Sequence, residues 1–312
     1  MRKNLIVVMD DIASITVAKD TSFAMLLEGQ RRGYQVHYLN ESALSLDGNR
    51  ALAEMHRITV CDDPDDWFSL GEVVKRPLGS DDLILMRADP PVDERYVFAT
   101  YLLDCAQANG ALVVNRPSAL RDFNEKLAIT RFPDLMPATR VSSNANALKD
   151  FVRAHGRAVL KPLDGMGGKS IFLASRDDQN LNVMIETLTD GGRKLAIAQQ
   201  FLPEIEDGDK RILIVHGQAV PYLLARIPMG DDFRGNLAKG GRGEGRALSA
   251  SDEAIARVVA PVLLDHGIEF AGLDVIGDRL TEVNVTSPTC VRELDQQFDL
   301  NIVSDLFDAI DP

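Results

Sequence analysis

Cysteine is scarce in this sequence, and long apolar runs are absent. The three cysteines, Cys61, Cys105 and Cys290, are far apart, and none belongs to a Cys-x-x-Cys pair. Dithiol chemistry and cysteine-pair zinc sites are therefore excluded, and a reducing cytoplasm is the expected compartment. Asp10 and Asp11 end the N-terminal apolar run early, so we expect neither a signal peptide nor a membrane-spanning segment.

The sequence also lacks an excess of positive charge. Its 34 Lys and Arg residues stand against 47 Asp and Glu residues, for a formal net charge of −13. A nucleic-acid-binding protein normally presents a basic face to the phosphates, so that class is disfavoured. The five histidines lack the i, i+4 spacing of helical metal ligands, and we interpret them as structural or surface residues.

What is present is the composition of a folded globular protein. Hydrophobic residues make up 45% of the chain and charged residues 26%. The length of 312 residues favours two domains, with one or three also compatible.

The first part of the chain, to about residue 123, alternates strand-like and helix-like segments. Apolar periodicity predicts strands at 5–9, 34–39, 83–86 and 111–114 and helices at 22–32 and 93–109. Asp93 is a suitable N-cap for the second helix, and Gly33 and Gly110 follow the two helix ends. This alternation predicts an α/β domain with a parallel sheet and ligands beyond the carboxyl ends of its strands.

From about residue 124 the pattern predicts a small α+β unit followed by hairpins. The predicted elements are strands at 159–163, 171–174 and 195–201, helices at 144–155, 181–189 and 251–266, and hairpins at 211–227 and 268–285. Between the first hairpin and the last of these helices, Met229 to Arg246 contains six glycines and almost no apolar side chains. We expect that segment to be mobile or ordered by a ligand, because little apolar surface offsets its conformational entropy.

A glycine loop, residues 163–170, follows the strand that carries Lys161. Its glycines let successive backbone amides point at one anion, and the lysine adds a full charge. The spacing fits neither a Walker A loop, whose first glycine would fall at Leu163, nor a dinucleotide fingerprint, which would need glycine at Ser170. A phosphate site and a plain hairpin turn therefore remain equally compatible with this segment.

The hairpin at 268–285 carries three oxygen-bearing side chains, Asp274, Glu282 and Asn284. Mg²⁺ prefers one or two carboxylates completed by other oxygens, so this set is suitable. Asp274 shares a face with the other two only if it pairs opposite Glu282, which requires a three-residue loop at 277–279 or an equivalent bulge. A two-residue turn without a bulge would place Asp274 on the other face. In isolation, the hairpin is more often a solvated polar face.

The order of these features along the chain is informative. Lys126 precedes Lys161 and the glycine loop, and a strand end, the glycine-rich segment and the acidic hairpin follow. This order resembles that of the ATP-grasp superfamily. The whole chain more narrowly resembles bacterial-type glutathione synthetases, through motifs at 19–26 (KDTSFAML), 86–91 (MRADPP), 120–126 (LRDFNEK), 161–168 (KPLDGMGG), 235–238 (GNLA), 240–243 (GGRG) and 282–289 (EVNVTSPT).

The resemblance implies an ATP-grasp fold in three parts. These are an N-terminal parallel-sheet α/β domain at 1–123, a central lid domain at 124–203 and a C-terminal antiparallel-sheet domain at 204–312. ATP would contact two phosphate-binding lysines, the glycine-loop backbone, a segment around adenine and one ribose-binding acid: Lys126, Lys161, Gly165, Met166, Gly167, Gly168, Gln199, Gln200, Phe201, Leu202 and Asp209. Asp274, Glu282 and Asn284 would hold Mg²⁺, or Mn²⁺ in its place, against the phosphates.

The implied reaction joins γ-glutamylcysteine to glycine and converts ATP to ADP and phosphate through an acyl phosphate. Arg211, Arg226 and Arg234 would surround the transferred phosphoryl group or the substrate carboxylates. The residues implied at the substrates are Arg87, at a dipeptide carboxylate, with Asn236, Pro288 and Thr289. The resemblance further suggests a homotetramer. Two alternatives remain, namely a carboxylate-amine ligase for other amino acids and a nucleotide-binding regulator without catalysis.

Overall fold

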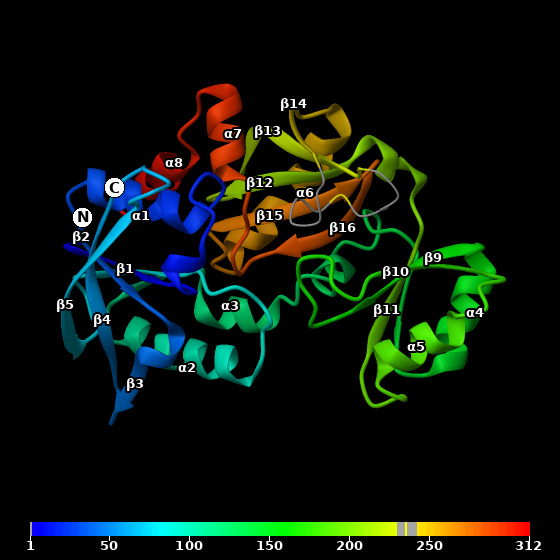
Figure 1. Ribbon diagram of the computed structural model, residues 1–312, viewed down its shortest axis with the longest axis horizontal. Coiled ribbons are helices and arrows are strands. Elements are labelled where there is room, and N and C mark those ends of the chain that lie inside the picture. The colour runs from blue at the N-terminus through cyan, green and yellow to red at the C-terminus, as the bar shows by residue number, and fades with distance from the viewer. Residues whose placement is uncertain (1, 230–234, 236–241) are drawn as a thin grey trace.

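The computed structural model describes residues 2–229, 235 and 242–312, which form three β-sheets with helices packed on them (Figure 1). The first sheet has seven strands, the second four and the third five. In Figure 1 the second sheet and its two helices stand at the right, while the first and third sheets lie together. Within the described ranges, no helix is both long and apolar enough to cross a membrane.

The parallel part of the first sheet consists of β2 (Gln35–Leu39), β1 (Asn4–Val8), β6 (Asp82–Met86) and β7 (Leu112–Val114), in that order. Side chains of β1 alternate between two cores. Leu5 and Val7 pack with α1 (Thr21–Arg31), whereas Ile6 and Val8 pack with α2 (Glu94–Ala108). Both faces are covered, which explains the continuous apolar run in the sequence. The predicted α/β arrangement is confirmed here, including Asp93 as the N-cap of α2.

An antiparallel extension of the first sheet was not anticipated from the sequence. It consists of β3 (Leu44–Asp47), β4 (Arg50–Val60) and β5 (Phe68–Pro77), with β4 pairing β2, β3 and β5. The predicted parallel sheet is therefore present, and this antiparallel part extends it beyond what was predicted. β4 alternates buried and exposed side chains, which is a half-buried strand pattern. Most of β5 is exposed, and its apolar residues, Phe68, Leu70, Val73 and Val74, form neither a continuous run nor a regular alternation.

The second sheet has its own hydrophobic core. Its order is β10 (Phe172–Ser175), β9 (Arg157–Pro162), β11 (Ala196–Gln200) and β8 (Thr139–Ser142), all antiparallel. Helices α4 (Ala145–His155) and α5 (Leu181–Thr189) cover it, and Asn144 caps α4 by accepting from two backbone amides. Its core residues include Leu148, Val152, Leu160, Ile185 and Ala198.

The third sheet is antiparallel, in the order β14 (Arg242–Ala247), β13 (Gln218–Ile227), β12 (Asp209–Val215), β15 (Phe270–Ile276) and β16 (Arg279–Asn284). One face packs with α6 (Ala250–Asp265), and the other with α7 (Val291–Phe298) and α8 (Ile302–Ile310). Each of these two cores continues into a core of the first sheet. The first and third sheets are therefore one packed body, to which the second sheet adds a separate core.

Short elements connect these layers. They are α3 (Pro117–Asp122) and 3₁₀ turns at Ile12–Ser14, Glu41–Ala43, Ala128–Arg131 and Pro203–Asp207. The three sheets fall within the predicted segments 1–123, 124–203 and 204–312, whose limits stay predictions.

The segment from Met229 to Arg246, expected to be mobile or ordered by a ligand, has a strand at its C-terminal part that was not predicted. Residues 242–247 form β14, which pairs with β13 through Tyr222 to Ile227. Backbone pairing with a neighbouring strand needs no apolar side chains, so the composition did not reveal it. Residues 230–234 and 236–241 lie outside the described residues.

Candidate active site

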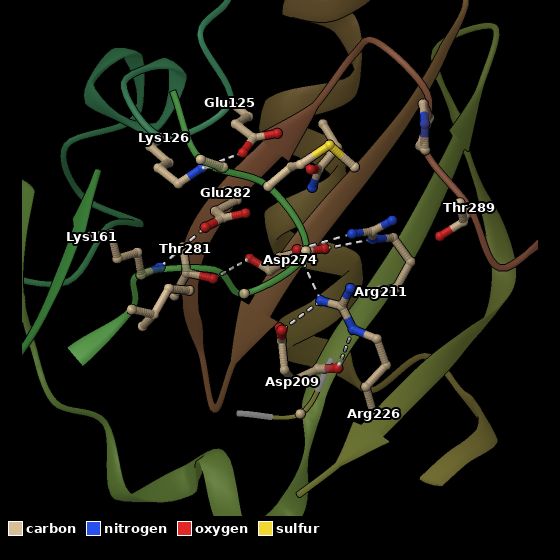
Figure 2. A pocket seen from close by; sticks show the side chains of 18 of the residues that line it. Glu125, Lys126, Lys161, Asp209, Arg211, Arg226, Asp274, Thr281, Glu282 and Thr289 are labelled. Carbon is tan, nitrogen blue, oxygen red and sulfur yellow. Dashed lines mark hydrogen bonds and ion pairs between the residues drawn. The ribbon is translucent and has the colours of Figure 1, made fainter. Parts of the chain in front are cut away.

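A cavity of about 560 Å³ lies where the three sheets meet (Figure 2). Its walls come from the glycine loop, the end of β11, strands β12, β13, β15 and β16, and the segment before α7. The N-terminal part adds Lys19, Asp20 and Asp89 at one end. Of the sequence-predicted residues, the cavity collects Lys126, Lys161, Gly165, Met166, Gly167, Gly168, Gln199, Gln200, Phe201, Leu202, Asp209, Arg211, Arg226, Asp274, Glu282, Asn284, Pro288 and Thr289.

The two lysines reach this cavity from different elements. Lys161 lies near the end of β9, and its Nζ is 3.2 Å from Glu282 Oε1. Lys126 Nζ donates to Gly165 O at 2.7 Å and also pairs with Glu125. Burial alone would lower the pKa of Lys126, but the carboxylates of Glu282 and Glu125 outweigh it and raise that pKa. The Lys126 ammonium is therefore charged, and both lysines are held at the cavity wall.

The acidic hairpin has the register that places its oxygens together. Asp274 pairs opposite Glu282, and Gly272 pairs opposite Asn284. Ile276 pairs with Arg279, so the turn has two residues, and a bulge next to Asp274 accommodates Thr281 as the extra residue. Of the two arrangements that the sequence left open for a shared face, the structure adopts the bulge.

Buried ion pairs surround Asp274 (Figure 2). Arg211 donates to both of its carboxylate oxygens, at 2.5 and 3.0 Å, and Arg226 lies 2.9 Å from Oδ2. Burial would raise the pKa of Asp274, but these two guanidinium groups hold it far below its usual range. Arg226 also donates to Asp209 Oδ2 at 2.5 Å. Burial nevertheless raises the pKa of Asp209 to about 6, with Asp274 and Glu282 adding to the shift.

Among the described residues, three cavity-lining side chains have a buried polar atom without a hydrogen-bond partner: Asp209 Oδ1, Gln199 Nε2 and Glu293 Oε2. Gln199 is only 3% exposed, so water does not readily supply the missing partner. Next to it, the backbone amides of Gln200 and Phe201 are already bonded to Ala138 O and Arg157 O. A polar ligand in this part of the cavity would satisfy Gln199 Nε2 and Asp209 Oδ1. The wall therefore fits a nucleotide with hydrogen-bonding groups.

The donor set on the hairpin fits a divalent cation bound together with phosphates. Among the described residues, no group of three or more His, Cys, Asp or Glu side chains is suitably arranged for a metal ion. Asp274 and Glu282 supply two carboxylates. Asn284 Nδ2 donates to Gly272 O at 3.2 Å, so the side-chain oxygen of Asn284 is the atom that would face a cation. Two carboxylates and an amide match the ligands of Mg²⁺ in phosphoryl-transfer sites, where phosphate oxygens complete the set.

Arg87 directly follows β6, as expected, but its side chain does not line the described cavity. Its guanidinium is buried behind the cavity wall and donates to Ser22 Oγ, Thr286 O and Pro288 O, the last at 2.9 Å. It is absent from the described cavity lining, and burial lowers its pKa to about 10. Arg87 thus holds the backbone that precedes α7, and its contact with a substrate stays a prediction. Two other predicted residues, Arg234 and Asn236, are outside the described ranges.

The sequence analysis gave no role to several residues at the N-terminal end of the cavity. They are Thr16, Lys19, Asp20, Asp89, Ser287 and Glu293. Burial raises the pKa of the Asp20, Asp89 and Glu293 carboxyl groups. The sequence analysis noted Lys19 and Asp20 only as members of the motif at 19–26. Their place in the cavity could not be predicted, because their proximity to α7 depends on the packing of the first sheet against the third.

Comparisons with known proteins cover nearly the whole chain. The family model described as "Prokaryotic glutathione synthetase, N-terminal domain" matches residues 4–121, and that of the ATP-grasp domain of the same family matches residues 125–299. The chain belongs to the prokaryotic glutathione synthetase family. The resemblance inferred from its motifs is thereby confirmed, and the chain is an ATP-dependent ligase of glutathione biosynthesis.

Individual relatives agree with this family. A glutathione synthetase of Xanthomonas campestris pv. campestris is 60% identical over 311 residues, covering 100% of this chain and 98% of that protein. One of Yersinia pestis is 54% identical over 306 residues, covering 98% and 96%.

Solved structures at low identity confirm the expected ATP-grasp fold. The D-cycloserine synthetase DcsG is similar with a TM-score of 0.67 at 14% identity, covering 98% of this chain and 100% of that one. The ATP-grasp ligase PsnB, complexed with precursor peptide PsnA2 and AMPPNP, has a TM-score of 0.60 at 16% identity, covering 99% and 97%.

Proposed function

We propose that the cavity phosphorylates the cysteinyl carboxylate of γ-glutamylcysteine with ATP and then joins it to glycine. The observation that carries this proposal is that Lys126, Lys161, Asp274 and Glu282 line one cavity, with Lys161 in direct contact with Glu282. Phosphoryl transfer depends on positioning and charge stabilisation, and these four groups supply both signs of charge.

The chemistry requires activation because a carboxylate has no good leaving group. Transfer of the γ-phosphoryl group to a carboxylate oxygen gives an acyl phosphate and ADP. The glycine amine then attacks the carbonyl carbon, the carbon–oxygen bond to phosphate breaks, and the nitrogen loses a proton as the amide forms. No nucleophilic side chain is needed, which accords with a cavity lined by lysines, arginines and carboxylates.

Each group in the cavity has a role in this proposal. Lys126, Lys161 and the glycine-loop amides bind ATP phosphates, while residues 199–202 enclose the adenine and Asp209 faces the ribose. Arg211 and Arg226 stabilise charge on the transferred phosphoryl group, since both are buried cations at fixed positions. The backbone at Pro288 and Thr289 faces the carboxylate of a substrate, held from behind by Arg87.

Mg²⁺, or Mn²⁺ in its place, completes the proposal. Asp274, Glu282 and Asn284 would hold it, and when bound it neutralises phosphate charge during transfer. We further propose a homo-oligomer, a tetramer by family resemblance, and a cytoplasmic location, where the three free cysteines stay reduced.

The decisive experiment measures ADP release by the purified protein with each reactant omitted in turn. We expect turnover only when ATP, Mg²⁺, γ-glutamylcysteine and glycine are all present, with glutathione as the product. Turnover with another acceptor and none with glycine would contradict the substrate assignment and leave a ligase for other amino acids. ATP binding measured by calorimetry without any turnover would instead indicate a silent nucleotide-binding protein.

A further inference from the structure

The turn at residues 124–126 connects the glycine loop to the acidic hairpin, which is the proposed metal-binding hairpin formed by β15 and β16. Asn124 Nδ2 donates to Leu163 O at 3.0 Å, and Lys126 Nζ donates to Gly165 O at 2.7 Å. The same turn is fixed to β16, because the amide of Val283 donates to Glu125 O at 2.9 Å. The loop that faces the phosphates and the strand that carries Glu282 are thus attached to one short segment.

Asn124 uses both ends of its side-chain amide in this connection. Its Oδ1 accepts from the backbone amides of Lys126 and Leu127, both at 3.1 Å, which shapes the turn. Its Nδ2 crosses to Leu163 at the start of the loop. Asn124 is half-buried and is not among the described residues that line the cavity. It is therefore placed to hold the loop without touching a ligand inside the cavity.

Two other contacts in this part of the chain use groups that a nucleotide needs. These are the bond from Lys126 to Gly165 O and the ion pair of Lys161 with Glu282. Under the proposed function both lysines bind phosphates and Glu282 binds the metal ion, so ATP and the metal compete with these two contacts. The bond from Asn124 to Leu163 involves none of those groups and persists when the site is filled.

We propose that Asn124 is a positioning residue that keeps the glycine loop on the metal-binding hairpin before and after ATP binds. Only the identity of the ligand in this statement rests on the proposed function. Because Asn124 acts on the phosphate-facing loop, it affects the binding of ATP and leaves the binding of the dipeptide and of glycine unchanged. An uncharged hydrogen bond of this kind changes an equilibrium by roughly three- to tenfold.

Two substitutions of Asn124 distinguish its two roles, which are shaping the turn through Oδ1 and bonding to Leu163 through Nδ2. Asn124→Asp keeps the oxygen that accepts from the two backbone amides and loses the donor to Leu163. Asn124→Ala loses both functions without adding charge. The matched controls are the same substitutions at Asn144, whose Oδ1 also accepts from two backbone amides, at 2.9 and 3.2 Å. No acceptor for its side-chain nitrogen is present among the residues that the structure describes.

The first readout is limited trypsin digestion with fragments identified by mass spectrometry. Lys161 precedes Pro162 and resists trypsin, so the bond after Lys169 is the tryptic site within the glycine loop. We expect cleavage there to rise roughly three- to tenfold in both Asn124 variants, with and without Mg²⁺ and a non-hydrolysable ATP analogue. The Asn144 variants should be cut as slowly as the wild type. This readout does not depend on ligase activity.

The second readout is steady-state kinetics. Asn124→Asp should raise the KM for ATP by a similar factor while the KM values for γ-glutamylcysteine and glycine stay unchanged. Unchanged cleavage and an unchanged KM for ATP would overturn the proposal, as would an effect confined to the charged variant while Asn124→Ala stays folded. If Asn124→Ala does not fold, Asn124→Asp decides alone. Faster cleavage in a protein without ligase activity would contradict the proposed function and leave the role of Asn124 intact.

Discussion

Arg211 and Asp274 lie directly opposite each other on β12 and β15, and the guanidinium of Arg211 donates to both carboxylate oxygens, at 2.5 and 3.0 Å. Such a two-point contact fixes the direction of both side chains. Arg226 adds a third donor at 2.9 Å from Asp274 Oδ2. The carboxylate is therefore surrounded by two cations, and the three groups respond to substitution as a unit.

The two-point contact can be tested with Arg211→Lys. Lysine keeps the charge but cannot donate to both oxygens in a fixed plane, so we expect kcat to fall by roughly one to two orders of magnitude. The fold should remain, because a cation still faces Asp274. Arg242→Lys, at an exposed pair with Glu244, is the control and should behave as the wild type. Equal kcat values for both variants would show that only the charge of Arg211 is required.

The position of Arg211 also depends on a glycine across the sheet. A Cβ atom at Gly272 would lie 2.7 Å from Arg211 Cδ and 3.1 Å from Pro288 Cβ, so Gly272→Ala should displace the guanidinium from Asp274. We expect a loss of kcat comparable to that of Arg211→Lys, with circular dichroism unchanged. At Gly79 a Cβ atom would make an ordinary contact, 3.4 Å from Asn109 O, and Gly79→Ala should leave kcat unaffected. Full activity of Gly272→Ala would mean that Arg211 has room to move.

Glu282→Gln tests the oxygen set on the hairpin. The substitution keeps the shape and removes the charge that faces Lys161 and the proposed metal ion. We expect turnover to fall by about a hundredfold or more at saturating Mg²⁺, since the site acts through charge. The protein should remain folded with a lowered melting temperature, because the buried Lys126 and Lys161 lose the charge that faces them. Glu244→Gln on β14 serves as the control, and near-normal turnover of Glu282→Gln would show that the hairpin is only a polar surface.

Asp295, outside the cavity, gives a pH-dependent prediction. Burial, reinforced by Asp305, raises its pKa from 3.8 to about 6. Between these values the native state holds a proton that the unfolded state has released, so the free energy of unfolding falls as pH rises through this window. Above about pH 6 the free energy of unfolding has fallen by the full amount that Asp295 contributes to this pH dependence.

Asp295→Asn should remove this fall in the free energy of unfolding, because asparagine does not ionise. Its side-chain oxygen can still accept from the amide of Ile302. We expect stabilisation of about 1 kcal/mol at pH 7.5, a figure that allows for solvent screening of a half-buried group, and little change at pH 4. Thermal melts at both pH values, with the exposed Asp150→Asn as the control, measure the difference. Equal effects at the two pH values would contradict it.

Local sequence signals were sufficient where one strand or one helix determines the arrangement. β1 was predicted from its apolar run, and α2 from Asp93 and the glycine after its end. The shared face of Glu282 and Asn284 follows from the alternation of side chains along any strand. The glycine loop and Lys161 were found because they are adjacent in sequence.

Contacts between distant segments were beyond such signals. The bulge at Thr281 decides whether Asp274 faces the cavity, and it is a property of two paired strands. The exposed strand β5 exists because β4 offers it hydrogen bonds, not because of its own composition. Arg87 was predicted to contact a substrate from its place after a strand, which stays a prediction. Its bonds to the carbonyls of Thr286 and Pro288 depend on the packing of the first sheet on the third and could not be predicted.

The separate core of the second sheet has a mechanical consequence. Since none of its buried apolar side chains belongs to the cores that unite the other two sheets, rotating it away breaks no hydrophobic cluster. The stiffness of such a motion then comes from a few polar contacts across the cavity, among them the ion pair of Lys161 with Glu282. The orientation of this unit should therefore respond to substitution of these few polar side chains more than to changes in its own apolar core.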